Sequence, residues 1–567
     1  MIGRTELGRA VMIASLISLL FCANATQAQS KNRQIGTSLT ATADPLVQRP
    51  HTKACVVNLF RDFQFALFAS TTQNFQFTPP QNCFGPWKEV VLDVDFSENA
   101  GRQFDRTAEL YLGNTNLYFG TTPEPISTSP NHWHVERDIT DYSALLTNPQ
   151  QGFMQLQNCT TDCPPPYNTL LTGVFTVSAR LEFYPTPGAS PAPRVADMVL
   201  PLIQTTASGG TNFPAFLFSP TDQYATTFQV PQNIEEAYLD VISQSQSVDE
   251  QWYACFPNDL NAINFFYGCG NTDFRETEIT IDGQPAGLAP VSPWVFTGFL
   301  PDQWRPIPAV QTLDFVPFRV NLTPFVSLLN DGNPHTISLS VFDDDSYFSS
   351  AAALLLYLDH GSGQVTGALT QNTLAGPSPV VTETLEGTSE VTGTIGVRQA
   401  RNYSVAGYAH TSHGKVSTSI SQQQSFSSSQ TIDFNTVDPF GTGPLDQNTS
   451  MQTSVGTTTR VVSNRGTTVT QENFSFPITV ETAYPVSNSV FGFTVVTAQK
   501  YQASKSVAQN GVVTDYLTTT NSAEASDVIP QSSSQTYTFY NLNGQPYNCT
   551  IRSASNVLTS VSVGCHH

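Results

Sequence analysis

Charged residues are scarce in this sequence, and positive charge is the scarcer kind. Charged residues make up 12% of the 567 positions, lysine occurs six times, and the formal net charge is −21 at pH 7. A surface of this sign repels phosphates, so we expect no nucleic-acid partner. Strong negative charge also suits acidic surroundings, where partial protonation of carboxylates relieves their mutual repulsion.

Several common catalytic motifs are missing as well. The sequence has no G-x-S-x-G elbow, no H-E-x-x-H motif and no P-loop. The nine histidines are scattered. His132 and His134 share a strand face and could bind a metal, but ordinary loop or surface histidines are commoner. "DDDS" at 343–346 could contact calcium, although a solvated turn explains it better. None of these features predicts a metal site.

Long hydrophobic runs are absent after the N-terminus. The one clear run, "AVMIASLISLLFCANA", follows Arg4 and Arg9 and leads into small residues. This pattern is typical of a secretory signal peptide over residues 1–29. A retained anchor is the alternative, but the run is short for a bilayer span. We expect a secreted or periplasmic protein with no membrane contact after cleavage of the signal.

Cysteines are few, but their number is even. Eight remain after the expected signal is removed, with no C-x-x-C spacing that would indicate a metal site. An even number in an exported chain favours disulfides. The cysteines form couples that are local in sequence, so nearest-neighbour pairing is expected although other connectivities are possible. The expected pairs are Cys55–Cys83, Cys159–Cys163, Cys255–Cys269 and Cys549–Cys565.

The sequence is rich in residues that form strands. Aromatics reach 11%, and period-two alternation recurs, as in "GVFTVSARLEFY" at 173–184. Helical patterns are almost absent; segment 323–332 is a short candidate, with Thr323 as its cap and Gly332 as its stop. The Ser/Thr/Gln-rich C-terminal part could be disordered, but regular alternation with Val, Ile, Phe and Tyr favours strands. The pattern predicts an all-β chain.

Composition also divides the chain into blocks. Residues 30–50 are polar and predict an extended lead-in, and "PTPGASPAPR" at 185–194 is typical of a semi-rigid linker. These breaks predict three consecutive β-domains, sandwich or jelly-roll in kind. Their expected limits are 51–186, 187–362 and 363–567.

Three stretches combine carboxylates with aromatic residues or arginine. They are "GRQFDR" at 101–106, "SVDEQWYAC" at 247–255, and residues 269–307. An indole packs on the apolar face of a sugar while carboxylates bind hydroxyls or act as acid and base. The tryptophans could equally be core residues with surface carboxylates beside them. In the first stretch, alternation puts Asp105 on the polar face of a strand with Glu109, as a solvated edge would also require.

The same stretches resemble the acidic peptide:N-glycanase A family, amidases that remove N-glycans from asparagine. The resemblance covers nearly the whole chain after the signal, in motifs such as "WHVERDITDYSALL", "FRETEITIDGQPAG" and "WVFTGFLPDQWRPI". A fainter similarity reaches the flavobacterial peptide N-glycosidase, whose catalytic unit is two adjacent jelly rolls. The resemblance implies two adjacent jelly-roll or β-sandwich domains forming the catalytic unit, followed by a C-terminal β-rich domain.

The resemblance also implies roles for single residues. "FDRTA" at 104–108 matches the strand that carries the family's catalytic aspartate, which makes Asp105 the base that activates water. Glu250 is the nearest counterpart of the second key carboxylate, although Asp249 or Asp273 could take that place. Glu250 would hold the sugar or assist proton transfer. Substrate-binding roles are implied for Arg106, Asn158, Trp252, Arg275 and Trp304.

The implied reaction is hydrolysis of the amide between N-acetylglucosamine and asparagine in N-glycopeptides or denatured N-glycoproteins. Two carboxylates in a cleft between the first two domains would catalyse it without a metal or other cofactor. A monomer, an acidic pH optimum and acceptance of core-fucosylated glycans are further expectations. Two alternatives stay open: an endoglycosidase that cleaves between sugars, and a non-catalytic carbohydrate-binding β-protein.

Overall fold

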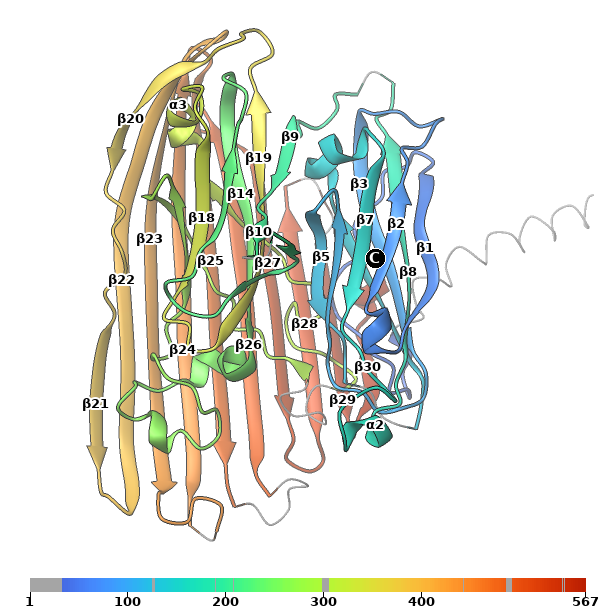
Figure 1. The fold of residues 1–567 in the computed structure, drawn as a ribbon, viewed down its shortest axis with the longest axis vertical. Coiled ribbons are helices and arrows are strands. Elements are labelled where there is room, and N and C mark those ends of the chain that lie inside the picture. Colours follow the sequence, from blue (N-terminus) through green and yellow to red (C-terminus); the bar gives the residue numbers. More distant parts are fainter. Residues whose placement is uncertain are drawn as a thin grey trace, which may run out of the picture.

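A computed structural model shows an all-β protein with a few short helices (Figure 1). It describes residues 33–124, 128–188, 190–206, 209–297, 305–441, 443–485, 492–542, 544 and 546–566. The expected signal peptide and Trp304 lie outside the described residues. Within these ranges, no helix is long and apolar enough to cross a membrane.

The first eight strands form a β-sandwich. Its two antiparallel sheets have the strand orders β1-β8-β3-β6 and β2-β7-β4-β5. The strands are β1 (Cys55–Phe65), β2 (Thr72–Phe77), β3 (Trp87–Glu98), β4 (Thr107–Leu112), β5 (Thr115–Thr121), β6 (Asn131–Asp138), β7 (Gln150–Leu156) and β8 (Phe175–Pro185). The short helices are η2 (Phe68–Ser70), η3 (Thr140–Leu146) and α2 (Tyr167–Leu170). Strand β8 confirms the expected strand at 173–184, and its buried and half-buried residues alternate as a sandwich strand requires.

The next eleven strands form a second sandwich. One sheet has the order β12-β19-β14-β17 with β9 on β19, the other has the order β13-β18-β15-β16, and β10 pairs with β11. The strands are β9 (Met198–Pro201), β10 (Gln204–Thr205), β11 (Thr211–Asn212), β12 (Ala215–Leu217), β13 (Tyr224–Phe228), β14 (Ile234–Gln246), β15 (Glu276–Ile281), β16 (Gln284–Pro290), β17 (Phe318–Asn321), β18 (His335–Phe342) and β19 (Tyr347–Leu358).

Among the described residues, four short helices connect strands of the second sandwich. They are η4 (Ser247–Ala254), η5 (Asn261–Ile263), η7 (Thr323–Phe325) and α3 (Val326–Leu329). The last two confirm the expected helical segment, and Gly332 follows it with φ +90°. The expected cap is wrong, because Thr323 is the first helical residue and no side chain caps this end. Its hydroxyl donates to the Ala237 carbonyl instead (3.4 Å).

The C-terminal part is one antiparallel sheet of eleven strands, so the alternative of disorder is wrong. The strands follow one another in sequence from β20 to β30, except that β21 pairs with β22 at one edge. They are β20 (Thr366–Asn372), β21 (Val380–Glu386), β22 (Glu390–Thr411), β23 (Gly414–Asn435), β24 (Leu445–Ser463), β25 (Gly466–Ala483), β26 (Thr494–Gln509), β27 (Val512–Ser526), β28 (Ser532–Asn541), β29 (Tyr547–Ala554) and β30 (Val557–Val561), followed by η8 (Val563–His566).

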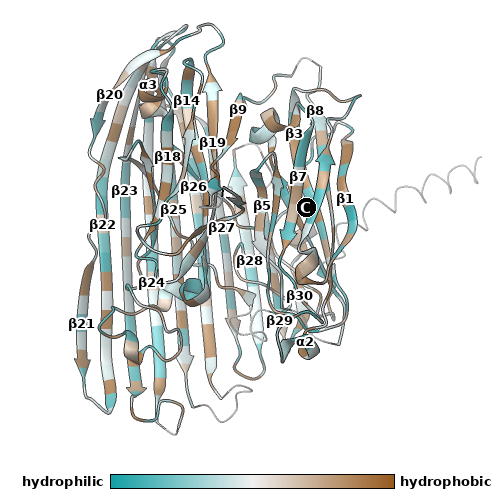
Figure 2. Ribbon diagram, viewed as in Figure 1, coloured by the Kyte–Doolittle hydropathy of each residue, from teal (hydrophilic) through white to brown (hydrophobic). Residues whose placement is uncertain are grey.

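The large sheet has one buried and one exposed face. Along β23, buried and exposed residues alternate for most of its length, with Ile420, Phe426 and Ile432 on the buried face. The long strands accordingly carry short bands of both hydropathy colours (Figure 2). Figure 1 shows this sheet lying behind the second sandwich. One hydrophobic cluster contains residues of both, including Leu339 and Met451, so the two share a core.

The lead-in segment joins the first sandwich to the far end of the large sheet. The guanidinium of Arg33 donates to the carbonyl of Cys565 (2.6 Å), while the peptide N–H of Thr40 donates to the side chain of Asn131 on β6 (2.9 Å). Residues 33–54 contain no strand, and these contacts hold the segment at both ends. All four expected disulfides are confirmed.

Candidate active site

The two expected catalytic carboxylates approach each other where the sandwiches meet. Asp105 lies two residues before β4 begins, and Glu250 lies on η4 directly after β14. The end of β14 contacts the start of β4, since Gln246 Nε2 donates to Thr107 Oγ1 (3.3 Å). Behind this contact, an apolar cluster joins the two sandwiches. Its members are Phe119, Ile242, Trp294, Phe296, Phe315 and Ala351.

Strand β4 is buried on both faces, so the alternative of a solvated edge is wrong; the prediction that Asp105 lies on the polar face of this strand is also wrong, because the strand begins only at Thr107. One face packs into the first sandwich, while the other is covered by the second, where Tyr111 packs on Phe213 with ring centroids 5.3 Å apart. Glu109 is 4% exposed, and this burial raises its pKa to about 8. Period-two alternation predicted the two faces correctly, but it could not show that a separate sandwich covers the polar one.

The two carboxyl groups differ in their surroundings. Burial, and then the negative charge of Asp105, raise the pKa of Glu250 to about 8, while Gln251 Nε2 donates to Glu250 Oε1 (2.8 Å). Glu250 therefore keeps its proton at neutral and acidic pH. Asp105 is half-buried. Two carboxyl groups whose surroundings differ in this way can divide acid and base roles between them.

The structure distinguishes Glu250 from the two alternative carboxylates. Asp249 is fully buried and pairs with Arg275, with 2.9 Å between Oδ1 and Nη2. Its other oxygen accepts the peptide N–H groups of Asp345 (2.8 Å) and Ser346 (2.6 Å). Asp273 is also fully buried and accepts a hydrogen bond from Gln430 on the large sheet (3.0 Å). Glu250, by contrast, lies near enough to Asp105 for the Asp105 charge to raise its pKa.

Arg106 lies beside this pair. Its Nη2 donates to Gln103 Oε1 (2.6 Å), and the guanidinium carbon lies 5.7 Å from the ring centroid of Phe104. Burial lowers the Arg106 pKa, whereas the charges of Asp105 and Glu124 oppose that shift. A partly buried guanidinium among carboxylates is suited to stabilising negative charge on a substrate.

Three other expected substrate-binding residues lie in the interior. Asn158 donates from its side chain to the carbonyls of Phe65 (2.8 Å) and Gly173 (3.1 Å), and Trp252 packs in the shared core at 0% exposure. Arg275 is enclosed by the carbonyls of its own loop as well as by Asp249. These contacts hold loops in place. Direct sugar contact by these residues remains a prediction that their placement does not support.

The structure adds a third carboxylate that the sequence patterns did not reveal. Glu124 is 4% exposed, and its charge contributes to raising the pKa of Glu250. A backbone hydrogen bond brings it close to the residues that precede β4. The N–H of Thr122, two residues before Glu124, donates to the carbonyl of Arg106 (2.8 Å). In the sequence Glu124 lies in "TTPEPIS", without the aromatic or arginine neighbours that marked the other candidates. Only strand pairing brings it to the site.

Removing the Glu124 charge is expected to lower the pKa of Glu250 towards its ordinary value. A Glu124→Gln variant keeps the side-chain shape and removes one of the two repelling charges. The titration of Glu250, followed by NMR on ¹³C-labelled glutamate, measures the shift. Glu524→Gln is the matched control, because it removes the same charge at an exposed position on β27. An unchanged Glu250 titration in Glu124→Gln would contradict the placement.

His134 is an ion-paired histidine in this structure. Its Nδ1 lies 2.8 Å from an oxygen of Asp95 and its Nε2 lies 2.9 Å from an oxygen of Glu136. Burial lowers its pKa, but these carboxylates raise it more, to about 10. Arg180 pairs with Asp95 as well (3.1 Å). A protonated imidazole beside an arginine does not favour a metal ion.

The "DDDS" turn at 343–346 is only partly solvated, because Asp344 is 1% exposed.

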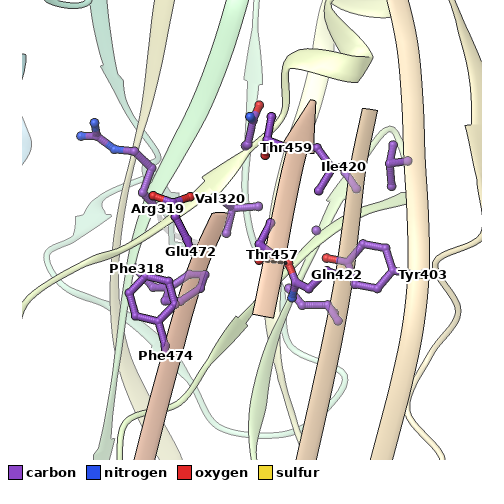
Figure 3. A pocket seen from close by; sticks show the side chains of 15 residues that line it. Phe318, Arg319, Val320, Tyr403, Ile420, Gln422, Thr457, Thr459, Glu472 and Phe474 are labelled. Carbon is purple, nitrogen blue, oxygen red and sulfur yellow. Dashed lines mark hydrogen bonds between the residues drawn. The ribbon is translucent and has the colours of Figure 1, made fainter. Parts of the chain in front are cut away.

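Two cavities lie away from the carboxylates. One of about 40 Å³ lies between β17 and the large sheet, lined by Phe318, Tyr403 and Gln422 among others (Figure 3). It is far smaller than the roughly 300–1,000 Å³ of a ligand pocket. The other, of about 510 Å³, lies at the first sandwich near Trp87 and Pro193. Neither is lined by Asp105 or Glu250.

Two β-sandwiches that meet at a pair of carboxyl groups, one of which keeps its proton at neutral pH, define an all-β protein with a candidate acid–base site at the junction. Comparison with known proteins identifies the family. Residues 45–373 match the family described as Peptide N-acetyl-beta-D-glucosaminyl asparaginase amidase A, and the chain belongs to this family. The resemblance seen in the motifs is thereby confirmed.

Individual proteins are similar to this chain as well. The curated Peptide-N4-(N-acetyl-beta-glucosaminyl)asparagine amidase A of Prunus dulcis is 28% identical over 404 residues, which cover 68% of each chain. Among solved structures, PNGase F, a glycosylasparaginase from Flavobacterium meningosepticum, is 14% identical with a TM-score of 0.36, over 54% of this chain and 96% of that one. PNGF-II is 13% identical with a TM-score of 0.36, over 54% and 66%.

Proposed function

We propose that this protein hydrolyses the amide bond between the innermost N-acetylglucosamine of an N-glycan and the asparagine side chain that carries it. The glycan is released and the asparagine becomes aspartate. The observation that carries the proposal is the pairing of Asp105 with a protonated Glu250 at the junction of two sandwiches, in a chain of this family. An amide is a poor electrophile, so its hydrolysis needs an activated water and a proton for the departing nitrogen.

The carboxylates divide these tasks. Asp105 accepts a proton as water attacks the amide carbon, and Glu250 hydrogen-bonds the sugar or supplies a proton to the nitrogen as the C–N bond breaks. Arg106 stabilises the negative charge that develops on the carbonyl oxygen. The products are a peptide aspartate and a glycosylamine, which a second water converts to the free sugar and ammonia. The scheme uses side chains of this protein alone.

Other features support the setting of this reaction. Four disulfides are typical of an oxidising compartment, which favours a secreted or periplasmic enzyme. Buried carboxyl groups that keep their protons favour activity at acidic pH.

We assign residues 51–186 and 187–362 to the catalytic unit and 363–567 to a supporting domain. The substrates are N-glycopeptides or denatured N-glycoproteins, and the enzyme acts as a monomer.

Digestion of a defined glycopeptide in ¹⁸O-labelled water tests the proposal. Mass spectrometry is expected to show aspartate at the former glycosylation site, with one labelled oxygen in its carboxyl group, because water attacks the amide carbon. A peptide that keeps one N-acetylglucosamine on unlabelled asparagine would identify an endoglycosidase instead. An intact glycopeptide after prolonged incubation across a pH series would leave only carbohydrate binding.

A further inference from the structure

The buried face of the large sheet carries glutamines that reach out of the sheet. Each is at most 6% exposed, and each hydrogen-bonds a group in another part of the chain. They are Gln424, Gln430, Gln447, Gln499 and Gln535. Burying an amide is costly unless it is hydrogen-bonded, so each of these buried glutamines indicates a specific contact.

Two of these glutamines hold the end of the helix that carries Glu250. Gln430 Nε2 donates to the carbonyl of Cys255 (2.9 Å), and Gln447 Nε2 donates to the carbonyl of Ala254 (3.0 Å). The two side chains also bond each other, from Gln447 Nε2 to Gln430 Oε1 (2.8 Å). Ala254 is the last residue of η4, about one turn after Glu250.

We propose that the Gln430–Gln447 pair positions Glu250 against Asp105, which makes the C-terminal sheet a working part of the active site. This inference rests on the proposed function. Neither glutamine contacts substrate in this scheme; both are positioning residues that act through the carbonyls at the end of η4.

The helix needs such an anchor because its own hydrogen bonds define it poorly. It is a 3₁₀ helix of eight residues, interrupted at Gln251 by non-helical angles (φ −107°, ψ 46°). Short helices of this kind are not stable by themselves. At its other end, Ser245 Oγ donates to the carbonyl of Glu250 (3.3 Å). Removal of the glutamines would leave the Ala254 carbonyl with the longer bond from Asn264 Nδ2 (3.4 Å), so this end of η4 would be held by the adjacent disulfide and by packing rather than by the sheet.

Gln430 also joins two ends of a loop. Its Nε2 donates to Asp273 Oδ2 (3.0 Å) as well as to Cys255, so one side chain bridges both sides of the loop closed by the Cys255–Cys269 disulfide. The sheet thereby fixes the loop as well as the helix. The strands themselves are rigid, because β23 and β24 are paired over eighteen residues.

The test compares three methionine variants in the full chain. Gln430→Met and Gln447→Met keep the length of the side chain and remove the amide that donates to η4. Gln535→Met is the matched control: it makes the same change on the same sheet, where Gln535 holds Ala43 and Asp44 of the lead-in. The measurements are Tm, kcat and KM on a glycopeptide, the Glu250 titration, and hydrogen exchange of residues 247–255.

Both η4 variants are expected to lose roughly tenfold in kcat with KM little changed, because small displacements of a catalytic group cost up to about 10²-fold. Exchange of 247–255 is expected to accelerate, and the Glu250 pKa to fall as water enters. Gln535→Met should lose comparable stability without these changes. Equal kcat, titration and exchange in all three variants would overturn the inference. If the wild-type protein produces no aspartate, the proposed function is wrong. Hydrogen exchange of 247–255 and the Glu250 titration then still show whether the Gln430–Gln447 pair holds Glu250.

Discussion

An Asp105→Asn variant is expected to lose about 10²- to 10⁴-fold in kcat, the usual contribution of a general base. The change keeps the size of the side chain and removes its ability to take a proton from water. Because Asp105 is half-buried and precedes β4 rather than lying within it, the fold should survive. Glycan release from a defined glycopeptide gives kcat, and thermal unfolding shows whether the variant is folded.

Two companion variants sharpen this experiment. Asp515→Asn makes the same substitution at an exposed position on β27 and should keep wild-type kcat. Glu250→Gln can still donate a hydrogen bond but cannot transfer a proton, so it separates the two roles of Glu250. A kcat close to wild type assigns sugar binding, and a loss like that of Asp105→Asn assigns proton transfer. Full glycan release by Asp105→Asn would refute the catalytic assignment.

The second large effect concerns stability, which is expected to fall as the pH rises from about 5 to 8. Burial raises the pKa of Glu98 to about 9, and burial raises that of Glu109 to about 8. Burial and the Asp105 charge raise the pKa of Glu250 to about 8 as well. In the unfolded chain such groups titrate near 4.5. The fold therefore concentrates carboxyl groups that hold protons at neutral pH.

The sign follows from proton binding. Between about pH 4.5 and 8 the folded state holds protons that the unfolded state has lost, so each pH unit costs about 1.4 kcal/mol for each such group. His134 acts in the same direction, because its pKa of about 10 gives stability that is lost as the pH rises. The pKa values of Asp95 and Glu136 are lowered, so their stabilising contribution disappears only in strong acid. Stability should peak in mild acid.

Thermal unfolding at a series of pH values checks this expectation. Tm should be several degrees higher at pH 5 than at pH 8. Glu98→Gln and Glu109→Gln should each flatten the dependence, because glutamine does not titrate. Glu524→Gln, an exposed control on β27, should leave the slope as it is. A Tm that rises steadily from pH 5 to pH 8 would show that these carboxyl groups are ionised in the folded protein.

Local patterns predicted much of the fold. Alternation indicated β8, and the same alternation favoured strands over disorder in the Ser/Thr/Gln-rich part, since it depends only on neighbouring residues. Sequence-local cysteine couples also predicted all four disulfides. The site was harder to predict. Trp252 and Arg275 carry the right chemistry for sugar binding, yet the structure buries both.

The sequence by itself determined that this is an all-β chain of a known amidase family, and it predicted Asp105 and Glu250 as the leading carboxylates. Composition, alternation and motif order carry that information along the chain. Only the tertiary structure decided which groups share the site. Strand pairing places Glu124 near Glu250, whereas Asp249 pairs with Arg275 in the interior. Gln430 and Gln447 of the C-terminal sheet hydrogen-bond the end of the helix that carries Glu250. The reason is physical: burial and proximity, which set a pKa or fix a helix, arise between segments that no local pattern connects.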